Sequence, residues 1–252
     1  MGAIASLEDS DLLGALRPAD RDLLVPFLED VEYAAGQVLY CPGDLVEFCY
    51  FPRGGAICSF FVEMDGNELV ETLLVGREGA LGGVVSQGSL PSFARASVLH
   101  RGRFWRIGTE RLGEVKRLSP AIAHLFARYA DCVMAQVFQS TACNAVHTIE
   151  QRAARWLGTA IDRIGRNDVT MTQEQLASMM GIGRSYASRV LQRFKRDGIL
   201  RTRRGGISVL DRAALDARAC RCNDAIRAHF DAVLAGVCLL YTSPSPRDKR
   251  QS

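Results

Sequence analysis

The spacing of apolar and polar residues divides this chain of 252 residues into three parts. Residues 7–30 and the segments beyond Ser119 place apolar residues three and four positions apart, which is the period of a helix with one buried face. Between these segments, short apolar runs alternate with turns rich in glycine, proline and aspartate. Such evenly spaced short strands are typical of a β-sandwich or barrel. The expected strands cover residues 37–40, 48–51, 56–62, 69–74, 94–99 and 104–107.

The segment from Ser119 to about residue 145 predicts one long helix. Ser119 suits the N-cap position, and Pro120 suits the first helical turn. About 25 helical residues span roughly 38 Å, and a lone helix of that length needs a partner. The partner is either a second copy of the chain or the β domain of the same chain. We favour a parallel dimer seam of positions about 3.5 residues apart. This seam is Ile122, Phe126, Tyr129, Val133, Gln136 and Val137.

Two helices separated by a glycine turn are predicted further along the chain. Residues 149–165 form a supporting helix in this prediction. Thr172 and Gln175 then have the spacing of a capping box, which marks a helix N-terminus. The turn Gly181-Ile182-Gly183 ends that helix, and another follows at about residues 184–196. Its apolar face is Ala187, Val190, Leu191 and Phe194.

A basic hairpin completes the motif. Residues 199–202 and 207–210 predict two strands, and the glycine pair in the turn between them suits a hairpin. Helix, turn, helix and hairpin in this order predict a winged helix-turn-helix, a module that places one helix in the DNA major groove. The alternative is a generic helical hairpin with a solvated basic face.

The distribution of charge favours the DNA-binding interpretation. Residues 1–118 carry 11 basic and 17 acidic side chains, whereas residues 149–212 carry 13 basic and 6 acidic ones. The whole chain has a net charge of only +3. A basic module joined to an acidic one is expected of a nucleic-acid binder. Double-stranded DNA is therefore the expected partner.

The remaining composition narrows the class of protein. The first residues lack a basic region followed by an apolar run, and no apolar stretch approaches 18 residues. We therefore expect no signal peptide and no membrane span, and a cytoplasmic location. The eight cysteines include no C-x2-C pair, so we expect buried thiols, no metal site and no cofactor. No catalytic motif is recognised, which favours a protein that is not an enzyme.

The motif and its order in the chain resemble the Crp/Fnr family of bacterial transcription regulators. The resemblance is strongest in TQEQLASMMGIGRSYASRVLQRFKRDGIL and extends to ACNAVHTIEQRAARWL. It implies an α+β fold, a homodimer on a near-palindromic DNA site, contact with RNA polymerase and a small-molecule effector. The expected parts are a cyclic-nucleotide-binding-like β-roll sensor domain (1–118), a long dimerisation helix (119–146), a winged helix-turn-helix domain (147–212), a C-terminal helical extension (213–236) and a disordered or non-native tail (237–252).

The resemblance assigns residues by position. Ser185 stands where the cyclic-AMP branch has a glutamate, and the pair Ser188-Arg189 resembles the Fnr branch. An arginine such as Arg189 can bind guanine through O6 and N7. The DNA-binding candidates are Thr172, Gln173, Arg184, Ser185, Tyr186, Ser188, Arg189, Arg193, Arg203 and Arg204.

The effector site departs from the family pattern. The family's cyclic-nucleotide pocket pairs Gly-Glu with Arg-Ser/Thr-Ala, and the aligned effector-pocket candidates here are Gly82, Gly83 and Arg95. The glutamate is missing and the arginine comes one residue late, which turns its side chain to the other face of a strand. We expect no tight binding of a cyclic nucleotide.

Two alternatives stay open. One keeps the fold and makes the cysteines a metal or redox sensor, with Cys220 and Cys222 as the first candidates. The other is a ligand-binding β-roll protein whose helix-turn-helix is not used. The Fnr branch's closely spaced N-terminal cysteines are absent, since none precedes Cys41. No single histidine is distinguished as a haem ligand.

Overall fold

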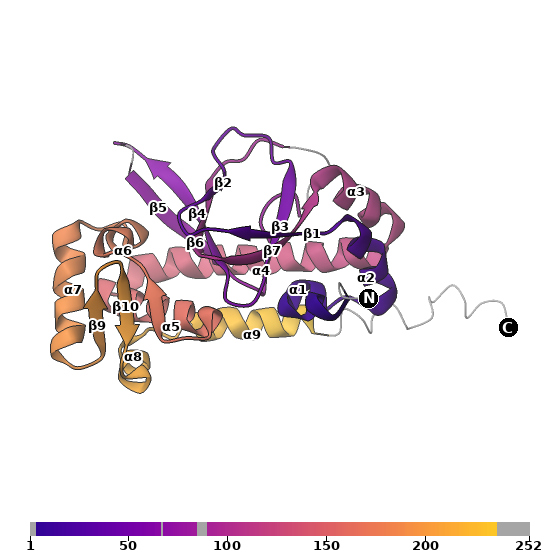
Figure 1. The fold of residues 1–252 in the computed structure, drawn as a ribbon. Helices are drawn as coiled ribbons and strands as arrows, with labels where there is room; N and C mark the ends of the chain where they lie inside the picture. Colours follow the sequence, from indigo (N-terminus) through magenta and orange to yellow (C-terminus); the bar gives the residue numbers. More distant parts are fainter. Residues whose placement is uncertain (1–3, 67, 85–89, 236–252) are drawn as a thin grey trace.

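The computed structural model describes residues 4–66, 68–84 and 90–235 (Figure 1). The expected tail at 237–252 lies outside the described residues. The described chain forms a β domain with short helices, one long helix beneath it and a helical domain at one end of that helix. None of the described helices is both long and apolar enough to cross a membrane.

The β domain is a roll of two antiparallel sheets, which confirms the expected β-rich sensor fold. One sheet has the order β1-β7-β3, built from Glu29–Tyr33, Gly102–Gly108 and Phe48–Pro52. The other has the order β2-β6-β4-β5, built from Val38–Tyr40, Arg95–His100, Ile57–Met64 and Glu68–Val75. Aromatic rings fill the space between the sheets; those of Tyr33 and Phe104 are 5.3 Å apart, edge to face. Strand β1 was not predicted, because Glu29–Tyr33 is largely polar and its strand pairing comes from β7.

Short helices cover the outer face of sheet β1-β7-β3. They are η1 (Ile4–Asp9), α1 (Asp11–Gly14), α2 (Pro18–Leu24), η2 (Val25–Phe27) and α3 (Thr109–Leu118). Their leucines pack with Phe51, Trp105 and the first half of the long helix α4 (Pro120–Val146). Ser119 caps α4 as expected and also donates a 2.6 Å hydrogen bond to Asp20. This contact fixes the start of α4 against α2.

The expected dimer seam on α4 is wrong in its first half. Ile122, Phe126 and Tyr129 are buried in the core of the same chain's β domain. The Tyr129 hydroxyl bonds both the amide and the carbonyl of Ala80, each at 3.0 Å. The packing of the β domain therefore uses the side of α4 that was expected to face a partner. The exposed side of α4 instead runs through His124, Ala127, Asp131, Met134, Phe138, Thr141 and Ala145.

The C-terminal domain has the predicted helices and one additional strand. Helices α5 (Ile149–Ile164), α6 (Gln173–Met180) and α7 (Arg184–Arg196) lie where the sequence predicts them. The hairpin strands β9 (Leu200–Arg203) and β10 (Gly206–Val209) are joined by β8 (Asp168–Thr170), giving the sheet order β8-β10-β9. β8 has only three residues, too few to give a recognisable pattern.

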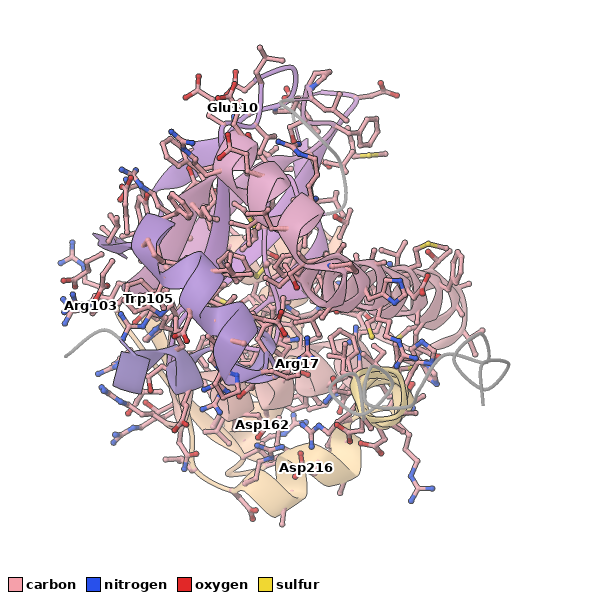
Figure 2. All side chains as sticks on the ribbon, turned by 90° about the vertical axis from the view of Figure 1, so that its right-hand side faces the viewer. Arg17, Arg103, Trp105, Glu110, Asp162 and Asp216 are labelled. Carbon is pink, nitrogen blue, oxygen red and sulfur yellow. The ribbon has the colours of Figure 1, made fainter. Side chains whose placement is uncertain are left out.

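The chain then returns along the long helix. Helix α8 (Arg212–Arg218) closes the C-terminal domain, and α9 (Cys222–Leu234) runs beside α4 towards the N-terminal helices (Figure 1). Phe230 and Leu234 pack against the core of the β domain, and Arg128 on α4 donates a 2.6 Å hydrogen bond to the carbonyl of Val233. The end-on view in Figure 2 also places α9 next to α4. The last helix therefore ties the C-terminal domain to the N-terminal one.

Candidate DNA-binding surface

The first helix of the helix-turn-helix has both predicted end signals. The Thr172 side chain accepts from the amide of Gln175, and the Gln175 side chain accepts from the amide of Thr172. Gly181 ends α6 in the left-handed conformation at φ +63°, which favours glycine. These signals set the angle at which the next helix begins.

Helix α7 presents one apolar and one polar face. Ala187, Val190, Leu191 and Phe194 are buried, as predicted. Arg184, Ser185, Tyr186 and Arg189 are exposed, and Ser188 is half-buried. Gly183 gives the helix no side-chain cap, so the first amides of α7 point outward as hydrogen-bond donors. An exposed basic face beside free helical amides is suited to a phosphate-bearing partner.

Tyr186 supports Arg189 on this face. The Arg189 guanidinium carbon lies 5.1 Å from the centre of the Tyr186 ring, a cation–π contact. Tyr186 is itself exposed, so both groups are accessible. The contact limits the rotamers of Arg189.

The wing brings a second set of basic residues to the same side. The turn between β9 and β10 has Gly205 at φ +71° and leaves Arg203 and Arg204 exposed. Arg203 pairs loosely with Asp168 at 3.6 Å. A notch between the wing and the N-terminal ends of α6 and α7 is lined by Thr172, Gln173, Arg184 and Arg203. The structure therefore brings together candidates from three separate parts of the sequence.

Arg193 differs from the other candidates because a close ion pair joins it to another helix. Its guanidinium is 2.5 Å from the carboxylate of Glu150 on α5. Glu150 also pairs with Arg218 at 2.6 Å, and Arg218 pairs with Asp197 at 2.8 Å. This network holds α7 against α5 and α8, so Arg193 has a positioning role here.

A second ion network fixes α8 beneath α5. Arg212 pairs with Asp162 at 2.5 Å and with Asp216 at 2.8 Å, and the two aspartates lie close together in Figure 2. Burial opposes ionisation of Asp162, but its bonds to Arg212 and Arg227 outweigh this and lower its pKa. These ion pairs therefore fix α8 against α5 in the domain that carries the basic surface.

The C-terminal domain rests on the outer face of the β-roll. Ser178 on α6 donates a hydrogen bond to the carbonyl of Leu69, and Arg163 on α5 pairs with Glu78 at 2.5 Å. The indole of Trp156 donates a 2.8 Å hydrogen bond to Glu71, which also accepts one from Ser59 at 2.7 Å. Burial raises the pKa of Glu71 to about 7, although both hydrogen bonds act in the opposite direction. Sequence patterns did not single out Glu71, because its setting is created by residues far away in the chain.

The effector-pocket candidates do not supply the charged anchors that the expected pocket needs. Ala96 and Val98 of β6 face the interior of the roll, so the alternating residue Arg95 faces outward, opposite Phe61. Gly82 and Gly83 both have positive φ, and a side chain at Gly83 would collide with Thr109. A glutamate therefore does not fit at Gly83 without rearrangement, and Arg95 does not point into the roll.

The structure also gathers residues that sequence spacing did not connect. Cys143, His147, Cys220 and Cys222 bring their donor atoms within 4.8 Å of one another. Cys220-x-Cys222 is one local pair, and Cys143 and His147 lie more than 70 positions earlier. The spacing of Cys143 and His147, four residues apart at a helix end, is the one local signal that could have indicated the cluster.

Comparison with known proteins supports the fold and the C-terminal domain. The Crp-like helix-turn-helix domain family matches residues 151–218. A transcriptional regulator of the CRP family from Thermus thermophilus superposes with a TM-score of 0.64 at 19% identity, over 75% of this chain and 95% of that one. FixK2 from Bradyrhizobium japonicum gives 0.64 at 14% identity, over 77% and 98%.

A third solved structure is similar to this chain to the same degree. The c-di-GMP responsive global regulator CLP from Xanthomonas campestris gives a TM-score of 0.63 at 17% identity, over 77% of this chain and all of that one, at 100%. No curated protein sequence matches the chain. At these identities the structural likeness concerns the fold, while the family match concerns the DNA-binding domain. The chain therefore has the fold of the Crp/Fnr transcriptional regulators and carries their Crp-like helix-turn-helix domain.

Proposed function

We propose that this protein is a homodimeric transcription regulator that binds a near-palindromic DNA site through α7. The observation that carries the proposal is the exposed face of α7, where Arg184, Ser185 and Arg189 stand opposite a fully apolar buried face. This arrangement is what a recognition helix needs in order to enter the major groove. The match of residues 151–218 to the Crp-like domain supports it.

Different candidates have different roles in this proposal. Arg189 and Ser185 reach base edges, and Arg189 binds guanine through O6 and N7. Arg203, Arg204 and the free amides at the start of α7 bind phosphates, which supply affinity without sequence information. Thr172 and Gln173 lie in the same notch and join the phosphate contacts. Arg193 acts indirectly by holding α7 in place.

The exposed stripe on α4 provides the surface for a second copy. The stripe comprises His124, Ala127, Asp131, Met134, Phe138, Thr141 and Ala145, at alternating spacings of three and four residues. This is the repeat of a two-stranded coiled coil. Met134 is 52% exposed and Phe138 is 65% exposed, so two large apolar side chains one turn apart lie on this surface, as expected of a contact patch. Two copies joined here would place two α7 helices around a twofold axis.

The sensor half is proposed to work without a cyclic nucleotide. Its two expected anchors are absent or turned outward, as Gly83 and Arg95 show. A small-molecule effector of another class, contact with RNA polymerase, a cytoplasmic location and the absence of catalysis follow from the family likeness alone.

The test is selection from a random DNA duplex library with the purified full-length protein and no added effector. Enrichment of a twofold-symmetric site supports a dimeric reader, and its half-sites report on Arg184, Ser185 and Arg189. Binding should weaken steeply between about 50 and 200 mM salt because phosphate contacts release counterions. Failure to enrich any site, with or without cell extract, would contradict the proposal.

A further inference from the structure

Four metal-binding side chains meet where α4 ends and the C-terminal extension begins. Cys143 lies in the last turn of α4, and His147 is the residue that follows the helix. Cys220 lies in the short connection between α8 and α9, and Cys222 is the first residue of α9. Their donor atoms all fall within 4.8 Å of one another. We call these four residues the Cys3His cluster.

Two of the donor–donor distances in the Cys3His cluster match those around one tetrahedral zinc ion. Zn–S bonds of about 2.3 Å and Zn–N bonds of about 2.0 Å place sulfur atoms about 3.8 Å apart, and sulfur and nitrogen about 3.5 Å apart. The Sγ atoms of Cys143 and Cys220 are 3.6 Å apart, and Cys222 Sγ is 3.5 Å from Nδ1 of His147. The first pair is far outside the length of a disulfide bond, about 2.0 Å.

The surroundings of the Cys3His cluster suit a closed site. The three cysteines are at most 8% exposed and pack together as a small cluster of their own. Gln139, one turn before Cys143, donates a 3.2 Å hydrogen bond to the sulfur of Cys222. A donor of this kind supports a thiolate that binds a metal. Four protein donors in a buried setting leave no open position for substrate or water.

The charge balance around the site agrees with this assignment. Three thiolates and a neutral imidazole around Zn²⁺ carry a net charge of −1. Arg152 and Arg155 both interact electrostatically with Cys143, and the buried Nε atom of each has no hydrogen-bond partner among the described residues. Two cationic side chains beside the site offset that negative charge.

We propose that the Cys3His cluster binds one Zn²⁺ ion as a structural site. The ion joins the end of α4 to the connection between α8 and α9. It also lies next to Thr148, the N-cap of α5, where the long helix passes into the DNA-binding domain. A metal at this position holds that domain at a fixed angle to α4, and it holds α9 in place beyond residue 218, where the Crp-like match ends.

The test is metal analysis of the full-length protein purified without chelator, combined with cobalt substitution. We expect about one zinc ion per chain, and tetrahedral thiolate bands in the visible spectrum when Co²⁺ replaces zinc. The double variant Cys220→Ser/Cys222→Ser should lose the zinc. His147→Ala should weaken it, as measured by competition with a chromogenic chelator. Cys41→Ser, in the β domain, should keep the full complement.

Several results would overturn the proposal. They are a wild-type protein that binds neither zinc nor cobalt, zinc that persists in the double variant, iron with equimolar sulfide in place of zinc, or a disulfide between Cys143 and Cys220 in protein kept reduced. If the double variant does not fold, the cobalt spectrum of the wild-type protein and the half-buried position His147 still decide. Metal content is independent of DNA binding, so this test is separate from that of the proposed function.

Discussion

Arg189 is the residue on which the proposed sequence specificity most depends. It is exposed on α7 and lies over Tyr186, so its guanidinium is already positioned when DNA arrives. A bidentate contact to guanine discriminates against other bases by about 1–3 kcal/mol. The wing arginines lack such geometry and carry only charge.

Replacing Arg189 should therefore change specificity, whereas replacing Arg203 should change affinity. Arg189→Ala should relax the preference at one base position per half-site and weaken the best site by about 1–3 kcal/mol. Arg203→Ala should weaken all duplexes about equally and flatten the salt dependence. Binding titrations against single-base variants of the selected site measure both effects, with the exposed Arg196→Ala as control. Equal weakening of every duplex by Arg189→Ala would show that it contacts phosphate only.

Glu71 makes the stability of the contact between the two domains depend on pH. Its pKa is about 7 in the folded chain against 4.5 ordinarily, so between these values the folded chain holds a proton that the unfolded chain has released. Stability from this group is therefore full below about pH 4.5, falls as pH rises towards 7 and levels off above it. The total effect is on the order of 3 kcal/mol.

Glu71→Gln should remove this pH dependence. The amide keeps partners in Trp156 and Ser59 but does not titrate, so the variant should be more stable than the wild-type protein at pH 8 and similar to it at pH 4.5. Denaturant unfolding at both pH values measures the difference. Glu68→Gln, exposed on the same strand, is the control and should leave the profile unchanged. A Glu71→Gln profile parallel to that of the wild-type protein would rule out this role.

Among the elements, α4 has two functions on two sides. Its buried side completes the core of the β domain, and its other side carries the exposed stripe. Both sides of the helix carry large apolar residues, and spacing alone does not reveal which side the β domain covers. We chose the wrong stripe for the first half of the helix because large residues such as Phe126 and Tyr129 suit either surface.

A charge in the exposed stripe should separate the dimer. Phe138→Glu places two like charges near the twofold axis, so we expect a mass close to one chain in light scattering at concentrations where the wild-type protein is dimeric. Phe93→Glu changes an even more exposed phenylalanine in the β domain, where we expect no effect. A wild-type monomer, or a dimer that survives Phe138→Glu, would contradict the assigned surface.

At the scale of the whole molecule, local signals predicted more than long-range ones. Caps, glycine turns and buried faces gave α5, α6, α7 and the hairpin almost to the residue, since each signal lies within a few positions of the element that it marks. Strand β8, the partners of Glu71 and the Cys3His cluster depend on residues that only the tertiary fold brings together. The spacing of residues along one sequence does not determine which distant side chains the fold brings into contact.

Removal of zinc should loosen the whole C-terminal extension. With the proposed ion bound, the connection around Arg221 is held between α8 and α9. Treatment with a zinc chelator should therefore raise the rate of tryptic cleavage after Arg221 at least several-fold, as followed by mass spectrometry. Cys41→Ser should respond as the wild-type protein does. An unchanged cleavage rate would show that packing alone holds the extension.

The return of α9 along α4 also has a consequence for how the protein is made. Phe230 and Leu234 cover part of the β domain's core, yet they are synthesised about 100 residues after Val133, which packs in the same cluster. At about 5–20 residues per second, the ribosome takes several seconds to reach them. During that interval the newly made β domain leaves an apolar flank open to water. Until α9 has been made and packs, this flank of the nascent chain can aggregate or bind a chaperone.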